Sequence, residues 1–209
     1  MLKLNGKFIT FEGPEGSGKT SVIEGIKQYF DDNNIDYITT REPGGIRIAE
    51  DIRDIILNRE NVEMDAHAEA LLFAAARGQH LVEKVRPALQ AGKIVICDRF
   101  IDSSLAYQGH ARGLGIDEVF AINKFAIGDM LPDLTIFIDV PPKVGLKRVF
   151  DNIRKVDRLD LEDISFHEKV YEGYKILSER FHGRFKTVDG TNSKEQVIKD
   201  TIEVIKSVL

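Results

Sequence analysis

Short apolar runs alternate along the chain with longer segments in which apolar residues recur every three to four positions. The short runs are rich in β-branched and aromatic residues, which predicts strands. They lie at 7–12, 36–40, 93–97, 134–139 and 185–189. Strands that are apolar on both faces and alternate with helices are typical of a parallel sheet covered by helices on each side. The sequence therefore predicts an α/β fold, a three-layer sandwich with a five-stranded parallel sheet.

Two of the intervening segments show helical spacing clearly. Their apolar residues are Val22, Ile23, Ile26 and Phe30 in the first, and Ile48, Ile52, Ile55 and Ile56 in the second. Spacings of three and four place such residues on one face of a helix, which can pack against a sheet. We find no internal repeat, low-complexity run or linker, so we expect a single domain over residues 1–209.

The stretch 143–182 departs from this alternation, because about 40 residues separate two predicted strands. Its middle, 151–163, is almost entirely charged or polar. A charged run of this kind can be the solvated face of a helix. Alternatively, it is a mobile flap that brings charge to a site only when it closes, and we place this flap at residues 150–162.

Composition and charge indicate an ordinary globular protein. The chain has 209 residues, is 43% hydrophobic and carries a formal net charge of −5. An acidic chain lacks the positive field that attracts duplex nucleic acid, so any anion must be held by locally clustered cations. The single cysteine, Cys97, cannot form an internal disulfide, and the sequence has no signal-like or membrane-spanning apolar run. We therefore expect a cytoplasmic protein with no membrane or nucleic-acid partner.

A phosphate-binding motif follows the first predicted strand. Residues 13–20 read GPEGSGKT, which satisfies G-x-x-x-x-G-K-[ST] between a strand and a helical segment. Such a loop directs backbone N–H groups and the start of a helix at phosphate oxygens. Lys19 is expected to reach the β- and γ-phosphates of a nucleoside triphosphate, and Thr20 to offer its hydroxyl to Mg²⁺. The predicted nucleotide-binding residues are Gly13, Pro14, Glu15, Gly16, Ser17, Gly18, Lys19 and Thr20.

Other readings of this motif are less consistent with the chain. An unliganded Gly-rich turn would match the full pattern by chance in roughly one chain in a hundred of this length. A GTPase is disfavoured, because the closest match to the guanine motif NKxD, at Asn123 and Lys124, lacks the Asp. A motor or helicase ATPase needs a longer chain and a broader basic surface. Phosphoryl transfer to a small acceptor fits better, and a slow ATPase that signals through a partner is the alternative from another class.

Asp98 and Arg99 follow the third predicted strand, at the edge where parallel sheets place ligand groups. Asp98 can hold Mg²⁺ directly or through water, and Arg99 can clamp a phosphate of the acceptor. Asp98 can also cap the helix that follows, and the two roles are compatible.

Five segments of the chain resemble bacterial thymidylate kinases. They read FEGPEGSGKT at 11–20, TREPGG at 40–45, LLFAAAR at 71–77, DRFIDSSLAYQG at 98–109 and DRLD at 157–160. The resemblance covers essentially the whole chain in the family's order, and TREPGG together with DRF and SSLAYQG is its most specific part. It implies ATP- and Mg²⁺-dependent phosphorylation of dTMP to dTDP, on the path to dTTP, by a homodimer with a mobile lid.

The resemblance also implies how the base would be bound. Phe73 would stack on thymine, Arg77 would donate to a carbonyl oxygen of the base, and Gln108 would pair with the N3 edge. Phe73 and Arg77 are four residues apart, hence on one face of a predicted helix. Read without the family, Phe73 is more often a core residue, whereas an Arg in an apolar stretch requires an acceptor.

The sugar and phosphate of the acceptor are assigned in the same way. Tyr107 would lie against the deoxyribose and exclude a 2′-hydroxyl. Ser103 and Ser104 either contact the base or sugar or cap a helix. The remaining implied acceptor-site residues are Glu42 and Pro43 of TREPGG, and Arg53. Arg53 would join Arg99 on the acceptor phosphate. Alternatively, Arg53 lies on the exposed surface of an amphipathic helix.

Glu15 is electrostatically unusual, because a carboxylate among phosphates repels them. Its implied role is to contact the acceptor's sugar hydroxyl and the waters of Mg²⁺. Some thymidylate kinases follow this acid with a basic residue, but this chain has Gly16 there. The missing cation is expected in the flap, and Arg158 in DRLD matches the family motif best. The other candidates are Arg154 and Lys155.

Overall fold

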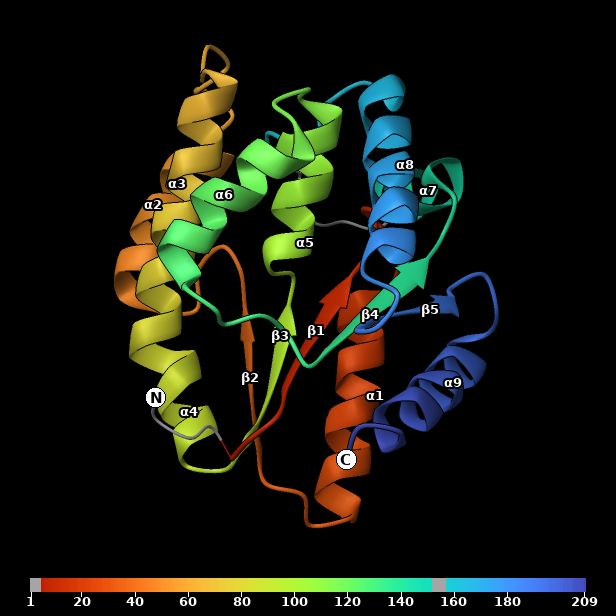
Figure 1. Cartoon of the computed structure of the whole chain (residues 1–209). Coiled ribbons are helices and arrows are strands. Elements are labelled where there is room, and N and C mark those ends of the chain that lie inside the picture. Colours follow the sequence, from red (N-terminus) through yellow and green to blue (C-terminus); the bar gives the residue numbers. More distant parts are fainter. Residues whose placement is uncertain (1–4, 152–156) are drawn as a thin grey trace.

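The structure is a computed structural model that describes residues 5–151 and 157–209. Its described part contains one parallel sheet (Figure 1). Its strand order is β2-β3-β1-β4-β5, and all four strand pairs are parallel. The strands are β1 (Phe8–Glu12), β2 (Tyr37–Arg41), β3 (Ile94–Asp98), β4 (Leu134–Asp139) and β5 (Phe185–Asp189). Every boundary lies within one residue of its predicted position, which confirms the predicted strands.

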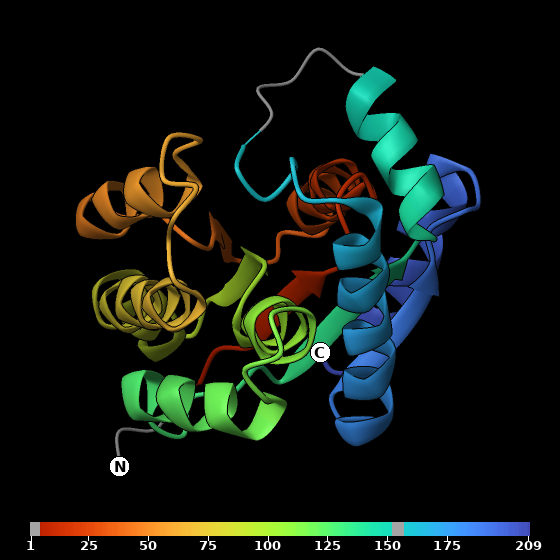
Figure 2. The ribbon, with the colours of Figure 1, turned by 90° about the horizontal axis from the view of Figure 1, so that it is seen from above.

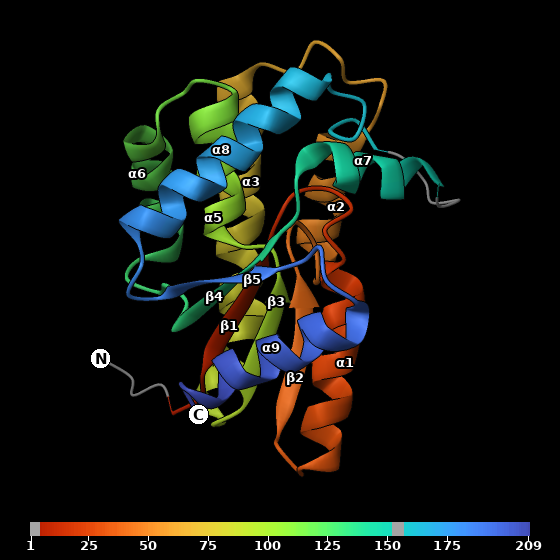
Figure 3. The same cartoon turned by 90° about the vertical axis from the view of Figure 1, so that its right-hand side faces the viewer.

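Apolar side chains of the strands alternate between two core layers. In β3, Val95 and Cys97 point into one layer, while Ile94 and Ile96 point into the other. The smaller layer is covered by two helices (Figure 3), α1 (Lys19–Asp32) and α9 (Lys194–Lys206). Both faces of the sheet are therefore buried, and the predicted three-layer α/β class is confirmed.

The larger layer is covered by most of the remaining helices. Two of them continue through π-helical segments: α3 into α4, and α5 toward α6. The helices on this side are α3 (Ala66–His80), η1 (Leu81–Val85), α4 (Arg86–Gln90), α5 (Ile101–Ser104), η2 (Leu105–Ala111), α6 (Ile116–Ile127) and α8 (Ile164–Arg180). Two further helices are α2 (Arg47–Leu57), which packs against α3, and α7 (Pro142–Asp151).

The two helical patterns named above behave differently. Val22, Ile23, Ile26 and Phe30 are all buried in α1, as expected for the face that packs on the sheet. In α2, Ile56 is fully buried, but Ile48 and Ile55 are 38% and 50% exposed. Ile48 and Ile55 are exposed because α2 lies at the margin of the helical layer, beside α3 (Figure 1).

The described part of the stretch 143–182 contains most of α7, a turn and α8. The solvated-helix interpretation of its charged middle is wrong for the described part, because residues 157–163 are not helical and Arg158 and Asp160 are buried. The alternative, a mobile flap, stays a prediction. Arg154 and Lys155 lie outside the described residues.

Figure 2 looks down on the carboxyl ends of the strands. Because every strand runs in the same direction, the segments that follow β1, β2, β3 and β5 all begin at this edge. Such edges are where open parallel sheets bind ligands.

Candidate active site

A cavity of about 570 Å³ opens at the carboxyl edge of the sheet, a volume typical of small-ligand sites. It is continuous from the phosphate loop to the helices of the larger layer. The predicted site residues that line it are Glu15, Gly16, Ser17, Gly18, Lys19, Thr20, Glu42, Pro43, Arg53, Phe73, Arg77, Asp98, Arg99, Ser103, Ser104, Tyr107 and Gln108. Gly13, Pro14 and Arg158 do not line it.

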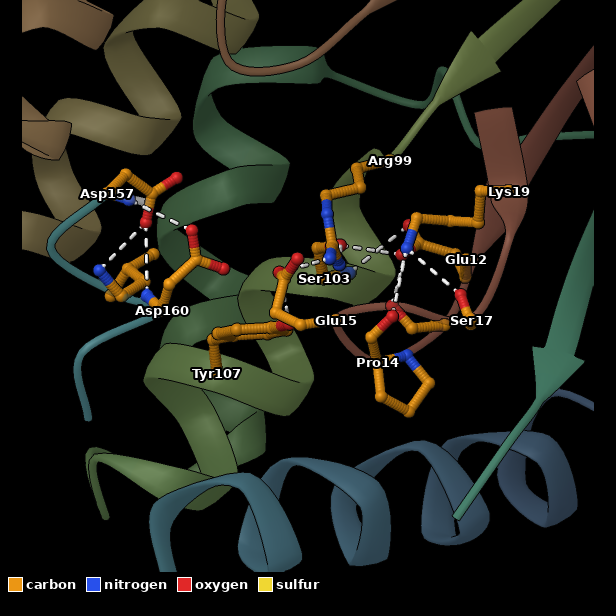
Figure 4. Close-up of polar contacts among 12 residues, drawn as sticks. Glu12, Pro14, Glu15, Ser17, Lys19, Arg99, Ser103, Tyr107, Asp157 and Asp160 are labelled. Carbon is orange, nitrogen blue, oxygen red and sulfur yellow. Dashed lines mark hydrogen bonds and ion pairs between the residues drawn. The ribbon is translucent and has the colours of Figure 1, made fainter. Parts of the chain in front are cut away.

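The phosphate loop leads directly into α1. Gly18 stands at the helix N-cap with φ of 91°, a conformation that favours glycine, and no side chain caps the helix. The N–H groups of the first turn are thus available to an anion. Lys19 is buried and folds back on the loop, where its Nζ donates to the carbonyl oxygens of Gly13 (2.9 Å) and Pro14 (3.1 Å) and to Ser17 Oγ (3.2 Å) (Figure 4).

The surroundings of Lys19 disfavour its charge. Burial and then the nearby Arg99 lower the pKa of Lys19 to about 8, although Asp98, Glu15 and Glu12 act in the opposite direction. A bound phosphate would favour the ammonium form. The lysine is therefore poised to respond to an anion in the loop.

Asp98 ends β3 beside the loop. Its Oδ1 is buried and has no hydrogen-bond partner among the described residues. The helix-cap alternative for Asp98 is wrong, because α5 begins at Ile101 with Phe100 at its N-cap and no side-chain cap. Within 5–151 and 157–209, no group of three His, Cys, Asp or Glu side chains could hold a metal alone. A cation here would need hydroxyl, water or phosphate oxygens beside Asp98.

Arg99 adopts a left-handed backbone conformation, with φ of 67°, which is uncommon for a residue other than glycine. Its guanidinium donates to Glu15 Oε1 (2.5 Å), Ser103 Oγ (3.2 Å) and the Tyr174 hydroxyl (3.1 Å). It also lies 5.2 Å from the centre of the Tyr107 ring. These contacts hold the arginine head in the cavity between the phosphate loop and α5.

Sequence analysis missed Glu12, the buried last residue of β1. It accepts hydrogen bonds from the backbone N–H of Phe100 (2.8 Å) and Ser103 (3.2 Å) and from the hydroxyls of Ser103 (2.6 Å) and Tyr174 (2.9 Å). Burial and then Asp102 raise the pKa of Glu12 to about 7. Glu12 thereby anchors the turn that carries Arg99. The sequence signal that could have identified Glu12 is an acidic residue at the end of an apolar strand.

At the other end of the cavity, Phe73 both packs in the core and lines the cavity, so its two readings are compatible. The expectation that Arg77 needs acceptors is confirmed. It is buried and donates to Glu42 Oε2 (2.7 Å), to Ser104 Oγ (3.1 Å) and to Asn123 Oδ1. Asn123, part of the rejected guanine motif, thus has a structural role.

The polar side chains of α5 and η2 complete this end of the cavity. Ser103 and Ser104 bond to other side chains and lie inside continuous helical structure, so the helix-cap alternative for them is wrong. The Tyr107 hydroxyl donates to Glu15 Oε1 (3.1 Å). Gln108 is 1% exposed, and its Nε2 donates to Glu69 Oε1 (2.8 Å).

Arg53 projects from α2 into the cavity, so it is not simply a surface residue. Its guanidinium donates to the carbonyl oxygen of Pro43 (3.0 Å). Arg41, which sequence analysis did not single out, lines the cavity beside it and donates to the same oxygen (3.0 Å). With Arg99, these residues form a concentration of positive charge in an acidic protein.

Arg158 lies apart from this concentration. It donates to Glu69 Oε2 (2.5 Å) and to the carbonyl oxygen of Ile56 (2.9 Å). Its neighbours Asp157 and Leu159 line the cavity instead. The structure thus brings the described end of the predicted flap to the cavity without bringing the Arg158 side chain there.

Sequence analysis also missed the cavity wall beyond the phosphate loop, which is formed by Arg148, Asn192 and Lys194. The last two follow β5. The rule that identified Asp98, that ligand groups follow parallel strands, would have found them if applied to β5.

Comparisons with known proteins agree with this geometry. A family model described as thymidylate kinase matches residues 11–201. The chain belongs to the thymidylate kinase family. Similar proteins named thymidylate kinase include one from Bacillus velezensis, 58% identical over 99% of this chain and 98% of its own, and one from Clostridium novyi, 57% identical over 96% and 98%. Another, from Oceanobacillus iheyensis, is 60% identical over 98% of this chain and 91% of its own.

Membership of the thymidylate kinase family confirms the resemblance drawn from the sequence motifs. The match includes every segment that carried the resemblance, from the phosphate loop to DRLD. The fold is that of a P-loop kinase, with the loop between the central strand β1 and helix α1.

Proposed function

We propose that this chain transfers the γ-phosphoryl group of ATP to dTMP, which yields ADP and dTDP and supplies the path to dTTP. The observation that carries the proposal is one continuous cavity, with the phosphate loop at one end and Phe73, Arg77 and Gln108 at the other. Arg99 contacts both sides, because its guanidinium donates to Glu15 of the phosphate loop and to Ser103 of α5. Two anionic nucleotides can therefore meet with their phosphates beside Arg99.

The acceptor would lie in the end formed by α3, α5 and η2. There Phe73 would offer a ring face to the thymine, while the N–H donors of Arg77 and the amide of Gln108 would read its edge. Tyr107 would close the space beside the deoxyribose. Arg53 and Arg99 would hold the phosphate, because arginine matches phosphate oxygens with paired N–H donors.

The donor would lie against residues 13–20 and the wall after β5. The residues present fit Mg²⁺, because Asp98 has a buried carboxylate oxygen without a hydrogen-bond partner among the described residues, and the hydroxyl residue Thr20 lines the same cavity. Both are oxygen ligands of the kind Mg²⁺ prefers. When bound, Mg²⁺ supplies charge neutralisation at the triphosphate oxygens.

The chemistry needs no general base from the protein. The acceptor is a phosphate whose second pKa is about 6, so its attacking oxygen is already ionised at neutral pH. The protein's task is to bring two polyanions into line and to stabilise charge on the group in transfer. We assign this to Lys19 and Arg99, with Glu15 orienting Arg99 and the acceptor sugar.

Closure of the flap, residues 150–162, would exclude water and add a further cation near the phosphates. Arg158, Arg154 and Lys155 remain the candidates. Support for a flap comes from Asp157 and Leu159, which already line the cavity at the edge of the described segment.

We also propose a single domain over residues 1–209, a homodimer and a cytoplasmic location. One sheet with two core layers supports the single domain. Exposed apolar side chains on the neighbouring helices α2, α3 and α6 support a subunit interface. They include Ile48, Ile55, Leu71 and Phe125. No helix in the described ranges is long and apolar enough to cross a membrane.

The test is ADP release with ATP, Mg²⁺ and each nucleoside monophosphate in turn. We expect dTMP to stimulate release most. Preference for another monophosphate would indicate a different nucleoside monophosphate kinase, and stimulation by a deoxynucleoside would indicate a deoxynucleoside kinase. Basal hydrolysis alone would indicate a nucleotide-gated binding protein.

A further inference from the structure

Glu69 of α3 is a buried carboxylate that receives hydrogen bonds from three side chains, two of them at η2 and one near the flap segment. It is 1% exposed and does not line the main cavity. Gln108 donates to its Oε1 (2.8 Å), and Arg158 donates to its Oε2 (2.5 Å). Arg112 donates to both oxygens (3.3 Å each). One side chain therefore links η2 to the described end of the flap segment.

The two arginines keep Glu69 ionised. Burial by itself would raise the pKa of Glu69, but hydrogen bonds from Arg158, Gln108 and Arg112 outweigh it and the pKa is lowered. An ionised carboxylate accepts hydrogen bonds and cannot donate them. Whatever faces Glu69 must therefore be a donor.

This requirement decides which way the Gln108 amide is turned. Its NH₂ group is directed at Glu69, and the reverse orientation would set the amide oxygen against a carboxylate. Gln108 lines the cavity, and none of the hydrogen bonds between described residues ends on its Oε1. The amide thus has an acceptor left for a ligand.

We propose that Glu69 is a positioning residue that determines the choice of pyrimidine: by holding the amide nitrogen of Gln108, it presents the Gln108 oxygen to the base. Thymine has an N–H at N3 and can donate to this oxygen, whereas N3 of cytosine is an acceptor and is repelled. The inference rests on the proposed function, which places the base of the acceptor between Phe73, Arg77 and Gln108.

The discriminating experiment replaces the carboxylate with an amide of the same shape. In Glu69→Gln, the new side chain offers both a donor and an acceptor, so the Gln108 amide can turn over and present its NH₂ group to N3 of cytosine. We expect the preference for dTMP over dCMP, measured as the ratio of kcat/KM values, to fall at least tenfold. Unequal changes in the two KM values should carry most of this fall.

Gln108→Met provides a second route that leaves Glu69 intact. Methionine has a similar shape but no amide, so the same loss of preference is expected. In the double variant Glu69→Gln/Gln108→Met, the loss should be no greater than in Gln108→Met alone, because the two residues act through one hydrogen bond. Arg112→Gln is the matched control, since it removes one partner of Glu69 and leaves the hydrogen bonds from Gln108 and Arg158 in place. Its preference should stay within threefold of that of the unmodified protein.

The outcomes are separable. A merely structural role for Glu69 would lower kcat/KM for dTMP and dCMP by the same factor and leave the ratio unchanged, which overturns the inference. An unchanged ratio in Gln108→Met overturns it too, even if Glu69→Gln does not fold. If the unmodified protein does not phosphorylate dTMP, the proposed function fails, and this is seen before any variant is compared.

Discussion

Arg99 and Glu15 form an ion pair across the cavity, with 2.5 Å between a guanidinium nitrogen and Oε1 of the carboxylate. Both side chains are 17% exposed, so the pair is largely shielded from water. The Tyr107 hydroxyl donates to the same oxygen of Glu15. The acid thus holds one nitrogen of the guanidinium that we propose binds the acceptor phosphate.

This pair predicts the effect of Glu15→Gln. The amide can still bond to a sugar hydroxyl but no longer holds Arg99 by charge, so we expect kcat to fall at least tenfold. KM for dTMP should not rise, because a negative charge beside the acceptor phosphate has been removed. Steady-state kinetics at saturating ATP check both values. Glu24→Gln, at an exposed site on α1, is the control. An increase in KM with unchanged kcat would contradict the prediction.

Nucleotide binding should be accompanied by proton uptake near pH 8. The pKa of Lys19 is about 8, chiefly because the group is buried and then because Arg99 is close. Phosphate oxygens raise that pKa, so about half a proton should be taken up per ADP bound at pH 8. Calorimetry in buffers of different ionisation enthalpy measures the uptake. Lys19→Met should abolish it, and buffer-independent heats in the unmodified protein would contradict the argument.

Glu12 should make the protein less stable as the pH rises from 5 to 8. Its folded-state pKa of about 7 lies above the unfolded value of 4.5, because the buried site favours the protonated form. The stabilisation is present below pH 4.5 and is lost as pH rises through 7. The unmodified protein should lose roughly 2–3 kcal/mol of unfolding free energy relative to Glu12→Gln over this range. Urea unfolding at several pH values measures the difference, and parallel curves would contradict it.

Gly16 and Gly145 set the phosphate loop directly against α7. A Cβ at Gly16 would collide with the carbonyl oxygen of Gly145, and a Cβ at Gly145 would collide with that of Glu15. Gly145→Ala should therefore displace the loop and raise KM for ATP about tenfold, a binding loss within the usual effect of overpacking. KM for dTMP should change less. Gly183→Ala, with no atom near the added methyl, is the control. Equal KM values for ATP in the two variants would show that the contact between Gly16 and Gly145 does not determine the position of the phosphate loop.

The same contact explains why position 16 carries no cation here, since any side chain at Gly16 would meet the α7 backbone. The flap remains the predicted source, and Arg158→Ala tests one candidate. Loss of the buried bond to Glu69 should lower the unfolding free energy by about 3 kcal/mol. In the folded variant at low temperature, we expect kcat to fall more than KM for dTMP rises. Unchanged turnover would leave the role to Arg154 or Lys155.

Local pattern was sufficient for the sheet and the phosphate loop. A strand such as β3 is a run of consecutive apolar residues, and residues 13–20 contain the glycines of the turn and the first residues of the helix that follows it. These features depend on interactions within a few residues, so they can be predicted without knowing the rest of the fold. Asp98 and Arg99 could be predicted as well, because a parallel sheet sends the ends of its strands to one edge.

Contacts between distant segments could not be predicted in this way. Glu12 bonds to Ser103, 91 residues away, and Glu69 bonds to Arg158, 89 residues away. Neither acid belongs to a periodic pattern that reveals its partner, and Ile48 and Ile56 share one pattern although only Ile56 is buried. Sequence alone determined which elements form and where the phosphate loop lies. Only the tertiary structure decided which buried charges meet, because the energy of a buried ion depends on the three-dimensional position of its partners.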